Sequence, residues 1–217
     1  HVAADGQTSS DMGHQAALKA IEAAGIDPSG IDLIVVGTTT PDYVFPSTAC
    51  LIQQKLGIPG CTAFDVNAAC SGFLFALGVA DQFIRTGSAR TVLVVGVETL
   101  TRMVDWTDRT TCVLFGDGAG AVVLKADADT GILSTHLHAD GNKRDLLCCP
   151  VGVSAGFDNS LPNAGVRITM AGNEVFKHAV KALDSVVDEA LEANGLDKGD
   201  LDWLIPHQAN LRIIEAT

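Results

Sequence analysis

The stretch Thr62-Ala63-Phe64-Asp65-Val66-Asn67-Ala68-Ala69-Cys70-Ser71-Gly72 joins the end of a buried strand to the beginning of a helix. Phe64 to Val66 has the apolar character of a strand end, and we expect the helix from Ser71 to Gly87. The residues at the junction are small, so the connection can turn tightly. A cysteine on such a turn reaches into a site without being crowded. The stretch therefore predicts an α/β fold with Cys70 at the end of a strand.

Cys70 has two interpretations from its local sequence. The first amides of the following helix point at its sulfur, and their partial positive charge favours the thiolate, which is the nucleophilic form. An unperturbed thiol, with a pKa of about 8.5, is only a few per cent ionised at pH 7, and lowering that pKa by ~2 units requires roughly 2.7 kcal/mol. Alternatively, Cys70 is a small buried residue that fills core volume, as most free cysteines do.

Composition limits the classes of protein that fit. The 217 residues are 47% hydrophobic and 18% charged, with a net charge of −12 and a mean hydropathy of +0.27. No apolar run reaches the ~18 residues needed to cross a bilayer, so we expect the apolar residues in buried strands and helices of an α/β protein whose sheet is covered on both faces. The negative charge argues against binding to nucleic acid or to an anionic membrane.

The cysteines favour a cytosolic protein with reduced thiols. None forms a CxxC pair, and no grouping of cysteine and histidine has the spacing of a zinc site. The adjacent pair Cys148 and Cys149 leaves a redox role open. The sequence has no signal peptide, and because it begins with His1 rather than Met, we expect that its natural start is not shown. The six cysteines are Cys50, Cys61, Cys70, Cys112, Cys148 and Cys149.

Hydrophobic periodicity and helix caps predict the order of the remaining elements. The helices are expected at about 11–24, capped by Ser9 or Ser10 and ended by Gly25, and at 47–56 and 171–193. Buried strands are expected at 31–37 and 91–97, with a loop at 38–46 that carries Tyr43 and Phe45, and an irregular polar segment at 98–109.

Two further segments have features of a ligand site, one for a dinucleotide and one for a metal, but both are better explained without a ligand. Gly116 to Ala121 has GxGxG spacing, but a dinucleotide fingerprint needs a helix after its glycines, whereas the expected strand Val122 to Lys125 follows here. Close backbone approach or a bulge explains these glycines better. A strand expected at 130–139 places His136 and His138 on one face; no third metal ligand is evident, so exposed histidines are favoured.

An internal repeat predicts the architecture. Shifted by about 170 residues, Gly25 to Val35 coincides with Gly195 to Ile205, and both segments follow an amphipathic helix and lead into a buried strand. The repeat indicates two similar α/β halves, and it places His207 at a strand end, where clefts form in α/β folds. A lone histidine is more often structural, yet Cys70 at a strand end of the other half favours catalysis. The counterpart of the Cys70 turn falls near residue 240, so we expect the chain to be part of a longer protein.

Four segments together resemble the β-ketoacyl-acyl-carrier-protein synthase III family of thiolase-fold condensing enzymes. The resemblance implies two pseudo-equivalent α/β halves in a five-layer αβαβα arrangement, incomplete here at both ends, and a homodimer. The halves are expected at residues 1–130, with the nucleophilic cysteine, and 131–217, with the connecting segment and the start of the second half. The four segments are 68–72 (AACSG), 115–121 (FGDGAGA), 170–177 (MAGNEVFK) and 206–212 (PHQANLR).

The same resemblance implies roles for individual residues. Cys70 matches the acylated nucleophile, and His207 matches one of two side chains that bind the carbonyl of the extender thioester. The family's second such side chain, an asparagine, and its glycine-rich oxyanion segment have no counterpart in this chain. The remaining matches are Arg109 to the residue contacting the CoA adenine, Asn173, Phe176, Ala209 and Asn210 to the pantetheine channel, Lys177 and Arg212 to the carrier-protein patch, and Phe45 to the residue that caps the acyl pocket across the dimer.

The activity implied is the initiation of type II fatty-acid synthesis in the cytoplasm. A short acyl-CoA, with acetyl-CoA favoured, would acylate Cys70, and malonyl-acyl carrier protein would then condense with the acyl group as CO2 is lost. The resemblance implies no metal and no cofactor beyond the CoA thioester substrate. Two alternatives stay open, a related thiolase-fold acyltransferase of secondary metabolism and a non-catalytic thiolase-fold partner subunit.

Overall fold

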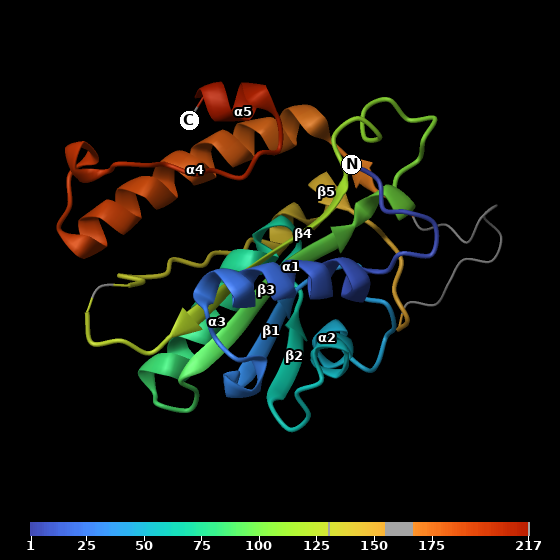
Figure 1. The fold of residues 1–217 in the computed structure, drawn as a ribbon. Helices are drawn as coiled ribbons and strands as arrows, with labels where there is room; N and C mark the ends of the chain where they lie inside the picture. Colours follow the sequence, from blue (N-terminus) through green and yellow to red (C-terminus); the bar gives the residue numbers. More distant parts are fainter. Residues whose placement is uncertain (130, 155–166, 217) are drawn as a thin grey trace. The chain divides into compact units, whose positions relative to one another are not determined.

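A computed structural model describes residues 1–129, 131–154 and 167–216 (Figure 1). The chain divides into two compact units, which are described separately. The first unit comprises His1–Leu100 and Gly116–Ile132, and the second comprises Thr101–Phe115 and Leu133–Thr217. The expected halves at 1–130 and 131–217, and their five-layer arrangement, stay predictions. Among the described residues, no helix combines the length and the apolar character needed to cross a membrane.

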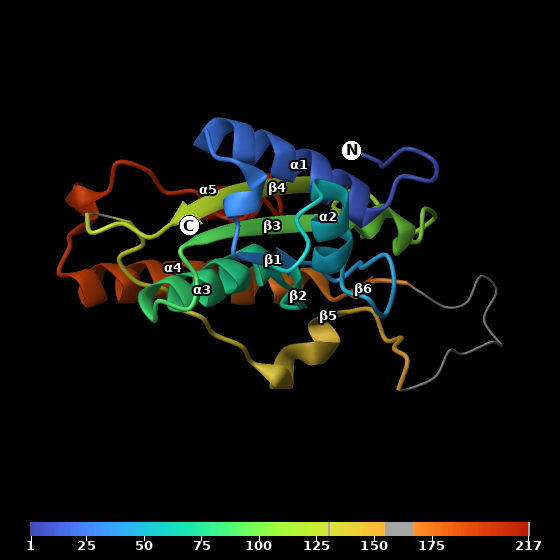
Figure 2. The ribbon, with the colours of Figure 1, turned by 60° about the horizontal axis from the view of Figure 1, so that its bottom comes forward.

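The first unit contains a four-stranded sheet in the order β2-β1-β3-β4. Strands β1 (Leu33–Gly37), β2 (Thr62–Val66) and β3 (Thr91–Thr99) are parallel, and β4 (Asp117–Lys125) pairs antiparallel with β3. Figure 2 shows α1 and α3 on opposite faces of this sheet. The α/β class and the buried strands predicted at 31–37 and 91–97 are therefore confirmed, with the second strand two residues longer than expected.

Helices α1 (Ser9–Ala24) and α2 (Thr48–Leu56) cover one face. Thr8 caps α1 in a capping box with Asp11, so the predicted cap at Ser9 or Ser10 is wrong. These two serines are buried within the first turn, where their hydroxyls reach the loop after β1 instead. Helix α2 is capped by Ser47 and so begins one residue later than expected, and both helices end at a glycine with left-handed backbone, as predicted for α1 at Gly25.

Helix α3 (Gly72–Arg85) covers the other face through small residues. Ala76 and Ala80 are fully buried against alternate side chains of β1 and β3, which include Val35 and Val94. Where these strands end, the residues on this face become glycine: Gly37, Gly96 and Gly120 are paired in register across β1, β3 and β4. We call these three residues the glycine row. The missing side chains of Gly37 and Gly96 leave space for the beginning of α3.

The glycine-rich segment forms part of a strand, which corrects the predicted loop. Strand β4 begins at Asp117, and its pairing with β3 is continuous from Asp117 opposite Thr99 to Lys125 opposite Thr91. The predicted bulge is therefore absent from this ladder, and the space beside Gly118 and Gly120 is open. Sheet pairing outweighs the weak strand preference of glycine. Because a strand occupies the position after the glycines, the dinucleotide interpretation stays excluded.

The second unit contains a long helix, α4 (Gly172–Asn194), a short helix, α5 (Leu211–Ala216), and a small antiparallel pair, β5 (Leu147–Cys148) with β6 (Thr169–Met170). Helix α5 contacts α4. The strand predicted at 130–139 is wrong for residues 131–139, which have no regular secondary structure, and Thr130 lies outside the described residues. Their histidines bind a side chain of α4 in place of forming a ladder.

The predicted repeat is reproduced in its first part. Gly25 and Gly195 end α1 and α4 with nearly equal backbone angles, φ 62° and 63°, and each is followed by a 3₁₀ turn, at Pro28–Gly30 and Lys198–Asp200. The strands that follow differ. Strand β1 forms, whereas Trp203 and Ile205 are 84% and 87% exposed and belong to no strand. An apolar segment becomes a strand only when a neighbour satisfies its backbone groups, and residues 201–206 have none within the described part of the chain.

Candidate active site

Cys70 lies in a 3₁₀ turn, Ala69–Ser71, between β2 and α3. Ala69 has φ +47°, which is in the left-handed region that residues with a Cβ rarely adopt, so the turn carries backbone strain. The next turn of chain touches β1, because a Cβ added to Gly37 would lie only 2.5 Å from the backbone carbon of Gly72. The tight strand-to-helix turn predicted for Cys70 is thus confirmed, and the missing side chain of Gly37 is what allows it.

The electrostatics of Cys70 differ from the expectation. Part of the Cys70 residue is exposed to solvent. The protein around its thiol nevertheless excludes water, and this burial raises the pKa of Cys70. The negative charge of Glu98 raises the same pKa further. The backbone amide of Cys70 lowers the pKa and is the weakest of the three influences. The predicted lowering is therefore wrong for the chain in this state.

Glu98 is a polar residue of this region that the sequence interpretation left in an irregular segment. It belongs to β3, and its carboxylate accepts hydrogen bonds from Thr39 N (2.7 Å), Thr39 Oγ1 (2.9 Å) and Thr40 Oγ1 (2.6 Å). Burial raises the pKa of Glu98, while these hydrogen bonds lower it. The sequence does contain a signal for Glu98: it directly follows the apolar run of β3, and the end of that strand lies at the same sheet edge as Cys70.

His207 lies in the second unit, in an exposed turn before α5. Its carbonyl accepts a hydrogen bond from Ala209 N (3.0 Å), and the side chain of Asn210 accepts one from Ile213 N (3.1 Å) at the beginning of α5. The strand end predicted before His207 is absent from the described residues. Cys70 and Phe45 belong to the first unit and the other candidate residues to the second, so their pairing in one site stays a prediction.

The remaining candidates occupy the start of α4 and neighbouring turns. Asn173 is exposed and Phe176 is half-buried on the first turns of α4, where Lys177 forms an ion pair with Glu174 (2.8 Å). Arg212 on α5 and Arg109 in the turn 107–112 are exposed. In the first unit, Phe45 is 84% exposed on the loop at 38–46. These positions leave the predicted side chains accessible to a ligand or partner, and their roles stay predictions.

The two histidines share a carboxylate that the sequence did not reveal. Glu189 of α4 accepts from His136 Nδ1 (3.1 Å) and His138 Nε2 (2.7 Å), and these hydrogen bonds lower the pKa of Glu189. His136 Nε2 in turn contacts Ser134 Oγ (2.8 Å). Among the described residues, no group of three or more histidine, cysteine, aspartate or glutamate side chains could hold a metal ion. These histidines instead fasten the segment 134–138 to α4.

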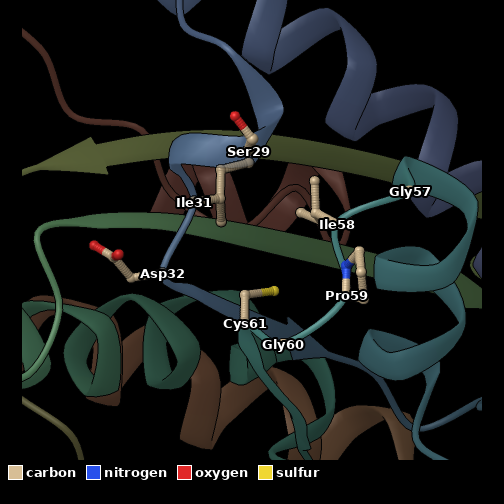
Figure 3. Close-up of a pocket in the computed structure, with 8 residues that line it drawn as sticks. All are labelled: Ser29, Ile31, Asp32, Gly57, Ile58, Pro59, Gly60 and Cys61. Carbon is tan, nitrogen blue, oxygen red and sulfur yellow. The ribbon is translucent and has the colours of Figure 1, made fainter.

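A shallow pocket of about 340 Å³ lies at the opposite, amino ends of β1 and β2 (Figure 3). Ile31, Ile58 and Pro59 form its apolar part, and Asp32 and Cys61 lie at its rim. Asp32 is engaged in accepting hydrogen bonds from the backbone amides of Arg90 and Thr91. The pocket therefore lies at the sheet edge away from the Cys70 turn and has no part in the chemistry considered for that cysteine.

Comparison with known proteins identifies related sequences. Residues 64–141 match the family described as 3-oxoacyl-[acyl-carrier-protein (ACP)] synthase III, and residues 191–217 match its C-terminal family. Over all 217 residues, the chain is 74% identical to β-ketoacyl-[acyl-carrier-protein] synthase III of Xanthomonas campestris pv. campestris strain 8004 and covers 66% of that relative. It is 61% identical to the protein of the same name from Thioalkalivibrio sulfidiphilus, of which it covers 67%. The chain thus spans about two thirds of the length of the curated relatives it matches.

Solved structures give the same result for the fold. All of the chain superposes on 66% of 3-oxoacyl-[acyl-carrier-protein] synthase III from Aquifex aeolicus VF5, with a TM-score of 0.89 and 46% identity. It superposes equally well on 67% of the synthase III from Thermus thermophilus (TM-score 0.91, 38% identity) and on 64% of the priming β-ketosynthase from the R1128 polyketide biosynthetic pathway (TM-score 0.92, 38% identity). These similarities confirm the predicted thiolase-like α/β class.

Proposed function

The chain belongs to the 3-oxoacyl-[acyl-carrier-protein] synthase III family, and we propose that the whole protein initiates type II fatty-acid synthesis by condensing a short acyl-CoA with malonyl-acyl carrier protein. The observation that carries this proposal is Cys70 on its strained turn, held against β1 by the contact between Gly37 and Gly72. A fixed turn between strand and helix presents a nucleophile in one orientation, which suits the formation of a covalent intermediate.

The first half-reaction is acyl transfer to Cys70. The thiol gives up its proton to solvent, and the thiolate attacks the thioester carbon of acetyl-CoA. The tetrahedral adduct collapses to acyl-cysteine as the CoA thiolate leaves and takes up a proton from solvent. In this proposal, amides at the Cys70 turn stabilise the oxyanion. Because burial and Glu98 raise the pKa of Cys70, the resting thiol is mostly protonated near pH 7 and substrate binding must accompany its ionisation.

The second half-reaction forms the carbon–carbon bond. Loss of CO2 from the malonyl group leaves an enolate whose oxygen carries the developing negative charge, and its carbon attacks the acyl-cysteine, which releases the Cys70 thiolate and the β-ketoacyl product. We assign His207 to donate a hydrogen bond to that enolate oxygen, a contact worth on the order of 3 kcal/mol. The chemistry needs no metal and no cofactor beyond the CoA thioester, which is consumed as a substrate.

Other assignments follow the same family relationship. We assign Arg109 to the CoA adenine, the residues Asn173, Phe176, Ala209 and Asn210 to the pantetheine arm, and Phe45 to the acyl pocket of a homodimer partner. Lys177 and Arg212 would receive the acidic carrier protein, and their exposure supports this role in a chain whose net charge is −12. A cytoplasmic location is supported by the six cysteines, all of which are free thiols.

The test of the first half-reaction is the mass of the intact, full-length protein after incubation with acetyl-CoA. We expect one acetyl group, located by peptide mapping on Cys70, and no adduct on the Cys70→Ser variant. Cys50→Ser is the matched control, since Cys50 is a half-buried thiol on α2, and it should acetylate normally. Absence of any acyl adduct on Cys70 with several short acyl-CoAs would remove the nucleophile assignment. Adding malonyl-acyl carrier protein then tests the condensation through the β-ketoacyl product.

A second candidate function is an acyltransferase of secondary metabolism. The structural similarity to the R1128 priming β-ketosynthase favours it specifically, since that protein shares the fold at 38% identity. Both candidates acylate Cys70, so the carrier protein distinguishes them. Condensation with the carrier protein of fatty-acid synthesis supports the first proposal, and condensation only with a polyketide carrier protein supports the second. A non-catalytic partner subunit would neither be acylated on Cys70 nor condense with either carrier protein.

A further inference from the structure

We propose that Glu98 is a positioning residue of the acylation site: its carboxylate fastens the root of the loop at 38–46 beside the Cys70 turn and places a negative charge near the nucleophile. This inference rests on the proposed function, because it concerns how Cys70 is prepared for acyl transfer. It assigns a role to a glutamate that contributes no atom to the reaction. Its support comes from three features of the first unit.

The first feature is the position of Glu98 at the carboxyl edge of the sheet. Two residues before it, Gly96 lies opposite Gly37 in the glycine row, and Gly37 contacts Gly72 just after Cys70. The chain after Gly37 stays at this edge, since Thr38 N donates to Val66 O (3.1 Å) at the end of β2. Glu98 and the Cys70 turn are thus held by adjacent strands at one edge of the sheet.

The second feature is the set of donors around the carboxylate. One oxygen of Glu98 accepts from the backbone amide of Thr39, and the other accepts from the hydroxyls of Thr39 and Thr40. These three donors match the acceptor-only chemistry of an ionised carboxylate. The Thr40 hydroxyl in turn accepts a hydrogen bond from Thr99 N (2.8 Å). Thr40 therefore binds β3 at two residues, Glu98 and Thr99.

The third feature is that the rest of the loop root is fixed to α1. The Ser9 hydroxyl donates to Thr40 O (2.6 Å), and Asp42 accepts from both Ser10 N (2.8 Å) and Ser10 Oγ (2.7 Å). Ser9 and Ser10 are almost completely buried. The root of the loop that carries Phe45 therefore forms hydrogen bonds with both β3 and α1. On β3, the charged partner is the carboxylate of Glu98.

The charge of Glu98 acts on Cys70, whose pKa it raises together with burial. Other acids at this edge are engaged elsewhere. Asp42 binds Ser10, Asp65 accepts from the amides of Thr48 and Ala49 at the start of α2, and Asp117 accepts from Ala3 N. Of the described carboxylates, Glu98 is the one that perturbs the Cys70 thiol. Its charge adds to burial, the larger influence, in favouring the protonated and less reactive form of the resting cysteine.

The test measures the rate of Cys70 alkylation by iodoacetamide against pH in the full-length protein, with peptide mapping to isolate Cys70. Glu98→Gln keeps the size of the side chain and removes its charge, so we expect the midpoint of the rate profile to fall. Glu98→Asp keeps the charge and should restore most of the wild-type midpoint. Glu22→Gln, an exposed glutamate on α1, is the matched control and should leave the profile unchanged.

A second variant keeps the proposal testable if Glu98→Gln does not fold. Thr40→Val removes one donor and leaves the carboxylate, so the Cys70 midpoint should stay at or above the wild-type value while proteolytic cleavage within 38–46 becomes faster. A midpoint that falls in this variant, or one that is unchanged in folded Glu98→Gln, overturns the inference. Acetylation of the same variants by acetyl-CoA separates the two proposals, because alkylation does not depend on acyl transfer. If the wild-type protein shows the midpoint shift on Glu98→Gln but is not acetylated itself, the proposed function is refuted and the charge coupling stands.

Discussion

Gly37→Ala is the substitution that tests most directly how the Cys70 turn is held. A Cβ at this position would lie 2.5 Å from the backbone carbon of Gly72, 2.6 Å from its oxygen and 2.8 Å from Phe73 N. All three atoms are backbone, so no side-chain rotation can relieve the clash. To reach an ordinary contact of about 3.4 Å, the beginning of α3 would have to move away from β1 by about 0.9 Å.

That displacement has two measurable consequences. Overpacking of this kind costs ~1–3 kcal/mol, and the reduced freedom of alanine in the unfolded chain returns only ~0.4–1 kcal/mol. We therefore expect Gly37→Ala to lower the free energy of unfolding, measured by urea denaturation. Because Cys70 immediately precedes α3, the same movement displaces the nucleophile, and a misplacement of about 1 Å can reduce a rate by about 100-fold. The rate of Cys70 acetylation should fall accordingly.

The glycine row supplies matched controls within the same sheet. At Gly96 the nearest atom to a new Cβ is Phe73 Cβ at 3.2 Å, and at Gly120 no atom lies within 4 Å. The expected order of damage is therefore Gly37→Ala, then Gly96→Ala, with Gly120→Ala close to wild type in both assays. If Gly37→Ala were as stable and as rapidly acetylated as Gly120→Ala, the backbone contact could not be what positions Cys70.

Two further predictions concern the second unit of the protein. His207→Ala should slow decarboxylation of malonyl-acyl carrier protein by about 100-fold or more while Cys70 still acetylates, which a CO2 release assay and intact mass would separate; equal loss in both steps would point to a structural role. For Glu189, hydrogen bonds from His138 and His136 hold the pKa below its usual value of 4.5, so its contribution to stability is present above about pH 4.5 and is lost as the pH falls through the lowered value. The difference in urea midpoint between wild type and Glu189→Gln should accordingly shrink on acidification, and a difference that stays constant down to about pH 3 would contradict this assignment.

Local signals placed most helices and parallel strands correctly because the responsible residues are adjacent in sequence. Gly25 ends α1 in the left-handed conformation that its sequence position predicted, and Gly57 and Gly195 end α2 and α4 in the same way. The continuous apolar runs of β1 and β3 likewise predicted strands covered on both faces, and the structure buries Val35 and Val94 completely. In these elements the sequence pattern and the packing agree.

The errors arose where a distant partner decides the structure. Asp117 to Ala121 joins β4 because β3 offers a complete ladder, which local glycine preference does not indicate. Residues 131–139 alternate like a strand, yet the strongest available partner for His136 and His138 is Glu189, more than 50 residues later. The prediction that the pKa of Cys70 is lowered is wrong for the same reason. The helix amides are local, whereas Glu98 reaches the site only through the pairing of β1 with β3.

The Cys70 turn is governed by residues that take no part in the chemistry. Gly37 lets α3 approach the sheet by lacking a side chain, and Glu98 fixes the neighbouring loop by hydrogen bonds that a shorter or neutral side chain would reproduce only in part. These two constraints act on the same edge of the sheet through different physical effects, steric exclusion and charge. Their consequences should therefore separate in experiment: Gly37→Ala should alter the rate of acylation without changing the pH midpoint of Cys70 alkylation, whereas Glu98→Gln should move that midpoint.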